Sequence, residues 1–334
     1  MSLYWKDITT PDNKWRGIEI TVEKSHIQKI NFHIESCSKR FFTINYENKT
    51  LLWARQHCLG YGVALIKNLQ RKQETPIISH IHSSDIEERK ELQGSEKFKS
   101  WSKYFIQSLN RIDNHFFTHG KWLITVFASS NWDYYGTEER NKSSFHKEIF
   151  NALKNNTFQY ISWVYTPNDK DMLFTSLNII DEHDGRLKWW RKKAKEKTLP
   201  PILVYFVSGL DSYIILDGHY RLKAAQLENI EPDIILLSNY ETEKYTIDTK
   251  IQTKVLKSLE NRNNKRNSKP LKQDALNKIF IDAYKKEYID VRHVSKSIQV
   301  STEICLQDMI SYLDKTNQIV LAQRFFDETD EKGW

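Results

Sequence analysis

The sequence contains few cysteines and no long hydrophobic run. Only Cys37, Cys58 and Cys305 occur in 334 residues, and none belongs to a Cys-x-x-Cys pair. This pattern fits neither a disulfide-rich scaffold nor a cysteine-based zinc site, and it favours a reducing compartment. The longest apolar run, 201–207, is far shorter than the roughly 20 residues of a membrane-spanning helix. Since the first residues also show no signal-peptide pattern, we expect a cytoplasmic protein without a membrane partner.

The composition is that of a chain with hydrophobic cores and a basic surface. Hydrophobic residues make up 39% and aromatic residues 13%, and the formal net charge is +7. Two segments, Arg186–Lys197 and Arg262–Lys272, concentrate the positive charge. They are candidate contacts for a nucleic acid, and a lysine-rich surface in water is the alternative explanation.

Hydrophobic periodicity divides the chain into three predicted regions. Residues 1–165 are predicted to form an α+β domain of unknown role, with strands between 17 and 53 and a helix at about 54–70. Residues 166–250 are predicted to form a mixed α/β core. The helical C-terminal region, 260–334, begins with a polar, Asn-rich linker at 260–270, and Ser301 is a candidate N-cap in it. The predicted fold class is α+β.

The clearest pattern lies in the middle region. The run PILVYFV is followed by SGLD, YIIL, DG, HYRLKAAQLEN, IEPD and IILLS. This order predicts a strand, a tight turn, a strand, a helix and a strand. The runs YIIL and IILLS do not alternate between apolar and polar residues, which is typical of strands buried on both faces.

The turn Asp217–Arg221 joins the second strand directly to the helix. The first amides of such a helix are unpaired and, with the helix dipole, favour an anion such as phosphate. Gly218 permits an unusual φ angle and a close ligand. Arg221 can bind two phosphate oxygens, and His219 can donate to the same group or transfer a proton. Asp217 has three roles open to it, as a helix cap, a Mg²⁺ ligand or a partner that orients His219. An ordinary Asp-Gly turn with solvated side chains is the competing interpretation.

The segment from about 175 to 240 resembles the core of the ParB N-terminal/sulfiredoxin-like superfamily. The resemblance rests on the proline-led strand, the DGHYR motif, the small residues Ala224 and Ala225, and the return strand. It implies a nucleotide-binding domain in which Gly218, His219, Tyr220 and Arg221 contact the nucleotide. Asp217 would then lie at the reacting end, with Mg²⁺ and ATP or another nucleoside triphosphate as cofactors.

Departures from the family motifs narrow this implication. Sulfiredoxins carry a reactive cysteine where this chain has His219, so sulfinic acid reduction is not expected. The glutamate-arginine motif of chromosome-partitioning members is absent. DGHYR is closer to the DGHHR motif of the free-serine kinases, although Tyr220 replaces the second histidine, which leaves any role of that histidine open.

An acidic cluster precedes the basic segment. The cluster consists of Asp181, Glu182, His183 and Asp184, and Gly185 separates it from Arg186. In kinase-like members of the superfamily an acidic residue ahead of this core is the base for the acceptor hydroxyl. Glu182 or Asp184 is therefore a candidate base or Mg²⁺ contact, and an acidic loop that caps the following helix is the alternative.

Together these observations predict an NTP-dependent phosphotransferase or nucleoside triphosphatase that acts at Asp217–Arg221, with catalytic candidates Asp217, His219, Asp184 and Glu182. A small-molecule acceptor fits this prediction, and residues that hold a metal are not identified. Two other functions stay open: a nucleotide-gated DNA-binding protein, and a non-catalytic defence or toxin-related interaction protein. Fold alone does not decide among them.

Overall fold

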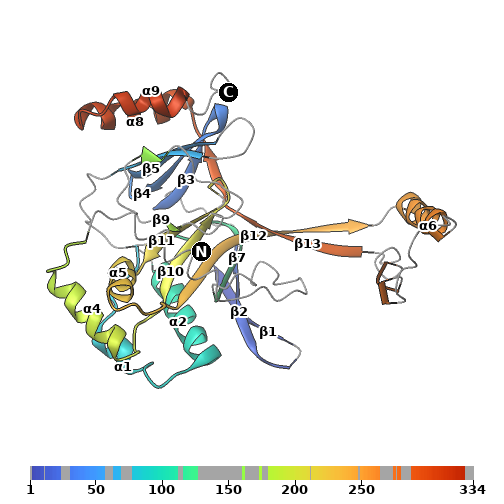
Figure 1. Cartoon of the computed structure of the whole chain (residues 1–334), viewed down its shortest axis with the longest axis horizontal. Coiled ribbons are helices and arrows are strands. Elements are labelled where there is room, and N and C mark those ends of the chain that lie inside the picture. Colours follow the sequence, from blue (N-terminus) through green and yellow to red (C-terminus); the bar gives the residue numbers. More distant parts are fainter. Residues whose placement is uncertain are drawn as a thin grey trace. The chain divides into compact units, whose positions relative to one another are not determined.

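A computed structural model provides the structure of the chain (Figure 1). It describes residues 2–10, 12–23, 31–56, 63–68, 77–111, 116–126, 160–161, 173–174, 180–210, 212–246, 249–263, 274–275, 277–279 and 287–327. The chain divides into two compact units. The larger comprises Met1–Tyr240 with His293–Trp334, and the smaller comprises Glu241–Arg292.

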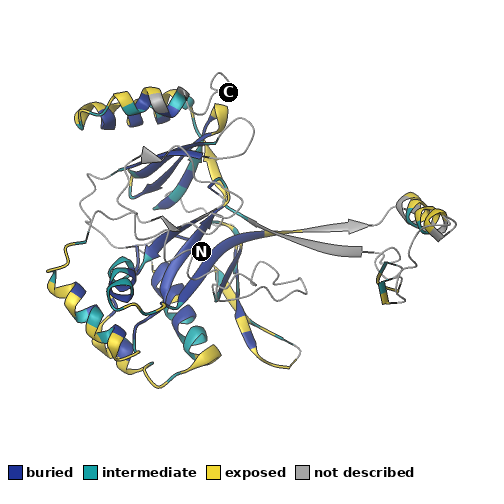
Figure 2. Ribbon diagram, in the orientation of Figure 1, coloured by how far each residue is buried: buried dark blue, intermediate teal, exposed yellow. Residues whose placement is uncertain are grey.

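The first sheet belongs mainly to the larger unit. Its strands, in spatial order, are β1 (Leu3–Thr9), β2 (Trp15–Val22), β7 (Gly120–Val126), β12 (Ile234–Thr246), β10 (Ile202–Val207), β11 (Ser212–Asp217) and β9 (Leu173–Phe174). The sheet is mixed, because β10 runs parallel to β12 and antiparallel to β11. Strand β1 stands at one end of this order, pairs with β2 and is mostly exposed (Figure 2).

The predicted succession of strand, turn, strand, helix and strand is confirmed as β10, β11, α5 (His219–Leu227) and β12. Every residue of β10 is buried, because apolar side chains pack on both faces of this part of the sheet. Leu203 and Tyr205 point into the main core, whereas Ile202 and Val204 pack in a smaller cluster. Alternate residues of YIIL in β11 and of IILL in β12 divide between the same two clusters, so the lack of alternation in these two runs has the physical cause that was expected.

The second sheet lies between the main core and the C-terminal helices. Its strands, in spatial order, are β14 (Ser297–Gln299), β3 (Phe32–Ser36), β4 (Phe41–Tyr46), β5 (Lys49–Gln56), β6 (Val63–Lys67) and β8 (Tyr160–Ile161). Glu47 and Asn48 form the β4–β5 turn with φ angles of 50° and 65°, as in the two-residue hairpins that suit twisted strands.

The helix predicted at 54–70 is wrong. The end of β5 and all of β6 occupy the described part of this segment, and Val63–Lys67 is buried throughout. A short apolar run that is buried on both faces of a sheet carries no alternation, so its pattern is the same as that of a buried helix.

The helices cover the two sheets on separate sides. Among the described residues, the helices of the larger unit are α1 (Ser83–Glu87), α2 (Gly94–Leu109), α4 (Gly185–Lys195), α5, α8 (Thr302–Lys315) and α9 (Val320–Asp327), with a short 3-10 turn η1 (Ser38–Arg40). Residues of α2, α4 and α5 join the main core, whereas α8 and α9 pack on the opposite face of the second sheet around Trp53 and Phe41. The predicted cap is confirmed, since the Ser301 hydroxyl accepts a hydrogen bond from the Ile304 amide at the start of α8.

The smaller unit contains the end of β12, α6 (Thr249–Asn263) and most of β13 (Glu287–Val294), and β13 pairs with β12. The C-terminal region, 260–334, is thus not only helical, because β13 and β14 also lie in it. The α+β class is confirmed. The superfamily fold stays a prediction, as do the domain boundaries 1–165, 166–250 and 260–334. Strands β2 and β7, from the first predicted domain, share a sheet with β10, β11 and β12 from the second.

Candidate functional site

The Asp217–Arg221 turn joins β11 to α5 through a single residue. Gly218 occupies the N-cap position with φ 108° and ψ 17°, and no side chain caps the helix in the part of the chain that is described. A Cβ atom at residue 218 would lie 2.9 Å from Arg221 Nη2 and 3.2 Å from the Ile202 Cα atom. Both the backbone angle and the space therefore require glycine. The first amides of α5 have no intrahelical acceptor.

Arg221 is held inside the protein. Its Nη2 donates to Asp217 Oδ2 at 2.7 Å and to the Pro201 carbonyl at 2.9 Å, and only 2% of the residue is exposed. The guanidinium lies 5.4 Å from the centre of the Trp190 ring. These contacts connect the end of β11, the start of β10 and α4. The Arg221 guanidinium was expected to face a ligand, but in this structure it fixes the turn. A contact between Arg221 and phosphate stays a prediction.

Asp217 does not cap α5, because Gly218 takes that position and the Asp217 carboxylate binds Arg221. The structure shows a role that was not among the three expected ones: Asp217 is the counter-ion of the buried Arg221 guanidinium. Such a pair resists disruption, since removal of either partner leaves an uncompensated charge or acceptor.

Asp184 caps α4. Its Oδ1 accepts from the Arg186 amide at 2.7 Å, and its Oδ2 accepts from the Tyr220 hydroxyl at 2.8 Å. The hydrogen bond from Tyr220 is the main cause of the lowered pKa of Asp184. The pKa of Tyr220 is raised, mainly by burial and secondly by the same hydrogen bond. The capping interpretation of the acidic cluster is therefore confirmed for Asp184. Both oxygens of the Asp184 carboxylate already accept hydrogen bonds, so a role as a base would require Asp184 to give up one of them.

The Asp184–Tyr220 bond also shows that the starts of α4 and α5 lie together, and the two helices are neighbours (Figure 1). Arg186 belongs to the same place. Its guanidinium lies 5.0 Å from the centre of the Tyr220 ring, and its Nη2 is 3.1 Å from His80 Nδ1. Arg186 thus presents an exposed cation beside the first turn of α5. Sequence reasoning assigned Arg186 only to a basic helix and missed His80, because no local pattern connects residues so far apart.

The other two candidates lie beside the same helix. His219 is the first residue of α5 and is partly exposed. Glu182 forms an ion pair with Lys223 of α5 at 2.9 Å, and this bond lowers the pKa of Glu182. The structure therefore brings Asp184, Glu182 and Asp217 to α5, each through a different side chain of that helix.

These carboxylates do not form a metal site of their own. Among the described residues no group of three or more His, Cys, Asp or Glu side chains has an arrangement suited to a metal ion. Each candidate carboxylate already binds a cation or a hydroxyl. A Mg²⁺ ion at this place would consequently have to be held largely by the phosphates of the ligand that brings it.

The basic helix α4 is partly neutralised and partly a core element. Trp190 is 2% exposed, and the Trp189 ring lies 4.3 Å from it, centre to centre. Glu228 pairs with both Arg191 and Lys195, at 2.5 and 3.2 Å. Both tryptophans thus contribute to the main core, Trp190 as a buried residue and Trp189 as a partly buried one. Of the second basic segment, Arg262–Lys272, only the first two residues lie in the described ranges.

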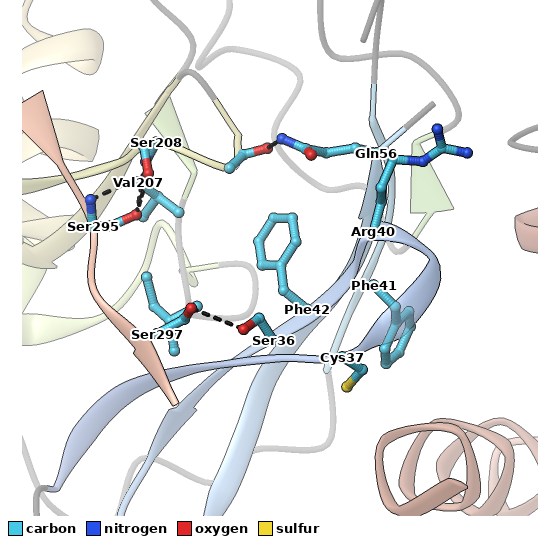
Figure 3. Close-up of a pocket in the computed structure, with 12 residues that line it drawn as sticks. Ser36, Cys37, Arg40, Phe41, Phe42, Gln56, Val207, Ser208, Ser295 and Ser297 are labelled. Atoms are coloured by element: carbon cyan, nitrogen blue, oxygen red, sulfur yellow. Dashed lines mark hydrogen bonds between the residues drawn. The ribbon is translucent and has the colours of Figure 1, made fainter. Parts of the chain in front are cut away.

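A cavity of about 180 Å³ lies at the other end of β10 and β11, where Val207–Gly209 meets the second sheet (Figure 3). Phe42 lines it and packs against Gly209, and Gln56 donates to the Gly209 carbonyl at 2.9 Å. The pairs Ser208–Ser295 and Ser36–Ser297 form its polar side. No residue of the Asp217–Arg221 turn contributes to the described lining, so this cavity and the turn are separate places.

Comparison with known proteins gave no match to any family model, curated protein or solved structure. No helix among the described residues has both the length and the apolar character needed to cross a bilayer.

Proposed function

We propose that the chain binds the phosphates of a nucleoside triphosphate at the start of α5 and transfers the terminal phosphoryl group to water or a small acceptor. The observation that carries this proposal is a helix that begins without a side-chain cap at a glycine with φ 108°, directly after a buried strand. An oriented set of amides on a rigid strand–helix junction is well suited to phosphate. The order β10–β11–α5–β12 also agrees with the resemblance to the ParB/sulfiredoxin-like superfamily.

The side chains around the turn divide into two groups. Arg221 and Asp217 form the frame, because their charges are paired within the fold. Arg186 and His219 are the groups that a ligand at the first turn of α5 would meet at the surface, since Arg186 is exposed over the Tyr220 ring and His219 is partly exposed at the first position of α5. In this proposal Arg186 supplies the charge-assisted contact that sequence reasoning assigned to Arg221.

The chemistry of phosphoryl transfer depends mainly on position and charge. The α5 amides and the Arg186 guanidinium would stabilise negative charge on the transferred group. Mg²⁺ would enter bound to the triphosphate. His219 would donate to a phosphate oxygen or move the proton of the acceptor hydroxyl.

A thermal-shift screen of nucleotides with Mg²⁺ tests the binding step. A ligand that prefers the folded chain stabilises it by about 2.7 kcal/mol at a hundredfold excess over Kd. Arg186→Ala should reduce the shift strongly. Lys192→Ala is the matched control, because it removes one positive charge from the same helix where the side chain is 73% exposed.

Phosphate release that requires Mg²⁺ and is lost in His219→Ala would support catalysis. A shift without phosphate release, together with DNA binding that weakens steeply with salt, would favour a nucleotide-gated DNA-binding protein. Absence of any shift at millimolar nucleotide would contradict the proposal and leave a non-catalytic interaction protein.

A further inference from the structure

Two distant segments lie in tight register beside the cavity. Strand β14 runs parallel to β3, with Gln299 opposite Ser36. The Ser36 hydroxyl is 2.8 Å from that of Ser297, and the Ser36 carbonyl accepts from the Val300 amide at 3.0 Å. These contacts fix the chain before α8 against the corner between β3 and β4.

The next contacts continue this register to the first turn of α8. The hydroxyls of Ser38 and Thr302 are 2.6 Å apart. Cys37 precedes Ser38, Cys305 follows Thr302 in the first turn of α8, and the two thiols are near enough for each to influence the pKa of the other. Both cysteines are free and buried, and they share one core cluster with Phe41. Two of the three cysteines of the chain thus lie in the same buried cluster although they come from opposite ends of the sequence.

Cys37 also forms part of the wall of the cavity of about 180 Å³, together with Ser36 and Phe42. Figure 3 shows the Cys37 sulfur on the side away from the Phe42 ring. Cys37 therefore borders a space large enough for a small oxidant. Burial raises the pKa of both thiols, so they are protonated at neutral pH and react slowly.

We propose that Cys37 and Cys305 form a reversible disulfide when a peroxide is the oxidant, and that this bond fastens α8 to the corner between β3 and β4. The Cys37 sulfur attacks one peroxide oxygen, the O–O bond breaks, and Cys37 becomes a sulfenic acid with release of one water. The Cys305 sulfur then attacks the Cys37 sulfur, the S–O bond breaks, and a second water leaves. The two thiols lose two electrons and two protons in total, and the peroxide is reduced to water. A dithiol reductant reverses the reaction.

The bond would close a loop that contains most of the chain. A cross-link between residues so far apart restricts the unfolded ensemble strongly, which predicts a Tm increase of about 5 °C. The native contacts on both sides of the pair change little, because α8 is already docked through the Trp53 indole, which donates to Asp308 at 3.0 Å.

The test uses the full chain in a Cys58→Ser background, which removes the third thiol. The protein is treated with hydrogen peroxide, and its intact mass, its disulfide map and its Tm are measured before and after a dithiol reductant. Matched controls are Cys37→Ser and Cys305→Ser in the same background. The expected result is a loss of two hydrogens, a peptide that joins residues 37 and 305, and a reversible rise of Tm, all absent from both controls. The reaction should be faster at alkaline pH, since only the thiolate is nucleophilic.

Three results would overturn the proposal. They are two thiols that stay open to alkylation after peroxide, a disulfide that forms only when denaturant has unfolded the chain, and a mapped bond that leaves Tm unchanged or lower.

Discussion

The Arg221–Asp217 pair offers a direct test of what holds the β11–α5 turn. Asp217→Ala removes the carboxylate that lies 2.7 Å from Arg221 Nη2 and leaves a guanidinium whose side chain is 3% exposed. Arg221 cannot lose its proton under ordinary conditions. The substitution therefore leaves a buried charge with less compensation.

The size of the effect follows from the contacts that remain. Removal of one partner of a buried ion pair costs about 3–5 kcal/mol. In this protein the Pro201 carbonyl still accepts from Nη2, and Asp217 is itself 21% exposed. Both facts reduce the penalty, so we expect a loss of about 3 kcal/mol in the free energy of unfolding. Asp217→Asn keeps an acceptor but no charge, and about half of that loss is expected.

Urea denaturation followed by tryptophan fluorescence measures this free energy. Glu182→Ala is the matched control, because it breaks an ion pair of similar length, 2.9 Å, in which Glu182 is 60% exposed. An exposed pair contributes little, so this variant should stay close to the wild type. If Asp217→Ala were no less stable than Glu182→Ala, the assignment of Arg221 and Asp217 to the frame of the turn would be refuted.

Three further predictions test the same reasoning at other positions. Gly218→Ala should lose about 2 kcal/mol because of its positive φ, whereas Gly185→Ala, whose added Cβ meets nothing within 4 Å, should not lose stability in the same urea assay. Burial lowers the pKa of Lys67 from 10.5 to about 8. Between these values the unfolded chain binds more protons, so the stability of the wild type relative to Lys67→Met should rise by about 3 kcal/mol from pH 8 to pH 10.5. Asp184→Asn keeps an oxygen that can cap α4 and should melt near the wild-type Tm, while Asp184→Ala should melt lower. Loss of phosphate release in Asp184→Asn with an unchanged Tm would instead reveal a base.

The sequence predicted those elements whose pattern is local. The order β10–β11–α5–β12 followed from apolar runs separated by turn residues, and the cap Ser301 followed from the residue type that precedes an apolar helix face. The segment Val63–Lys67 was predicted as helix because a strand buried on both faces has no period-2 signal.

The candidate site was predictable only in part, since its geometry depends on tertiary contacts. The turn and Gly218 could be located from the sequence, because only glycine suits a left-handed N-cap. The burial of Arg221 could not, because it requires Pro201 and Trp190 to meet the guanidinium from other elements. His80 likewise reaches Arg186 through the fold and not through any motif.

The pairing of β7 with β2 on one side and β12 on the other has a consequence for synthesis on the ribosome. Strand β2 leaves the ribosome early, but β7 gains its second neighbour only after residue 240 has been made. The short strand β14 joins β3 later still. Because so many partners are distant along the chain, folding should be slow, and nascent chains should rely on chaperones until the last strands arrive.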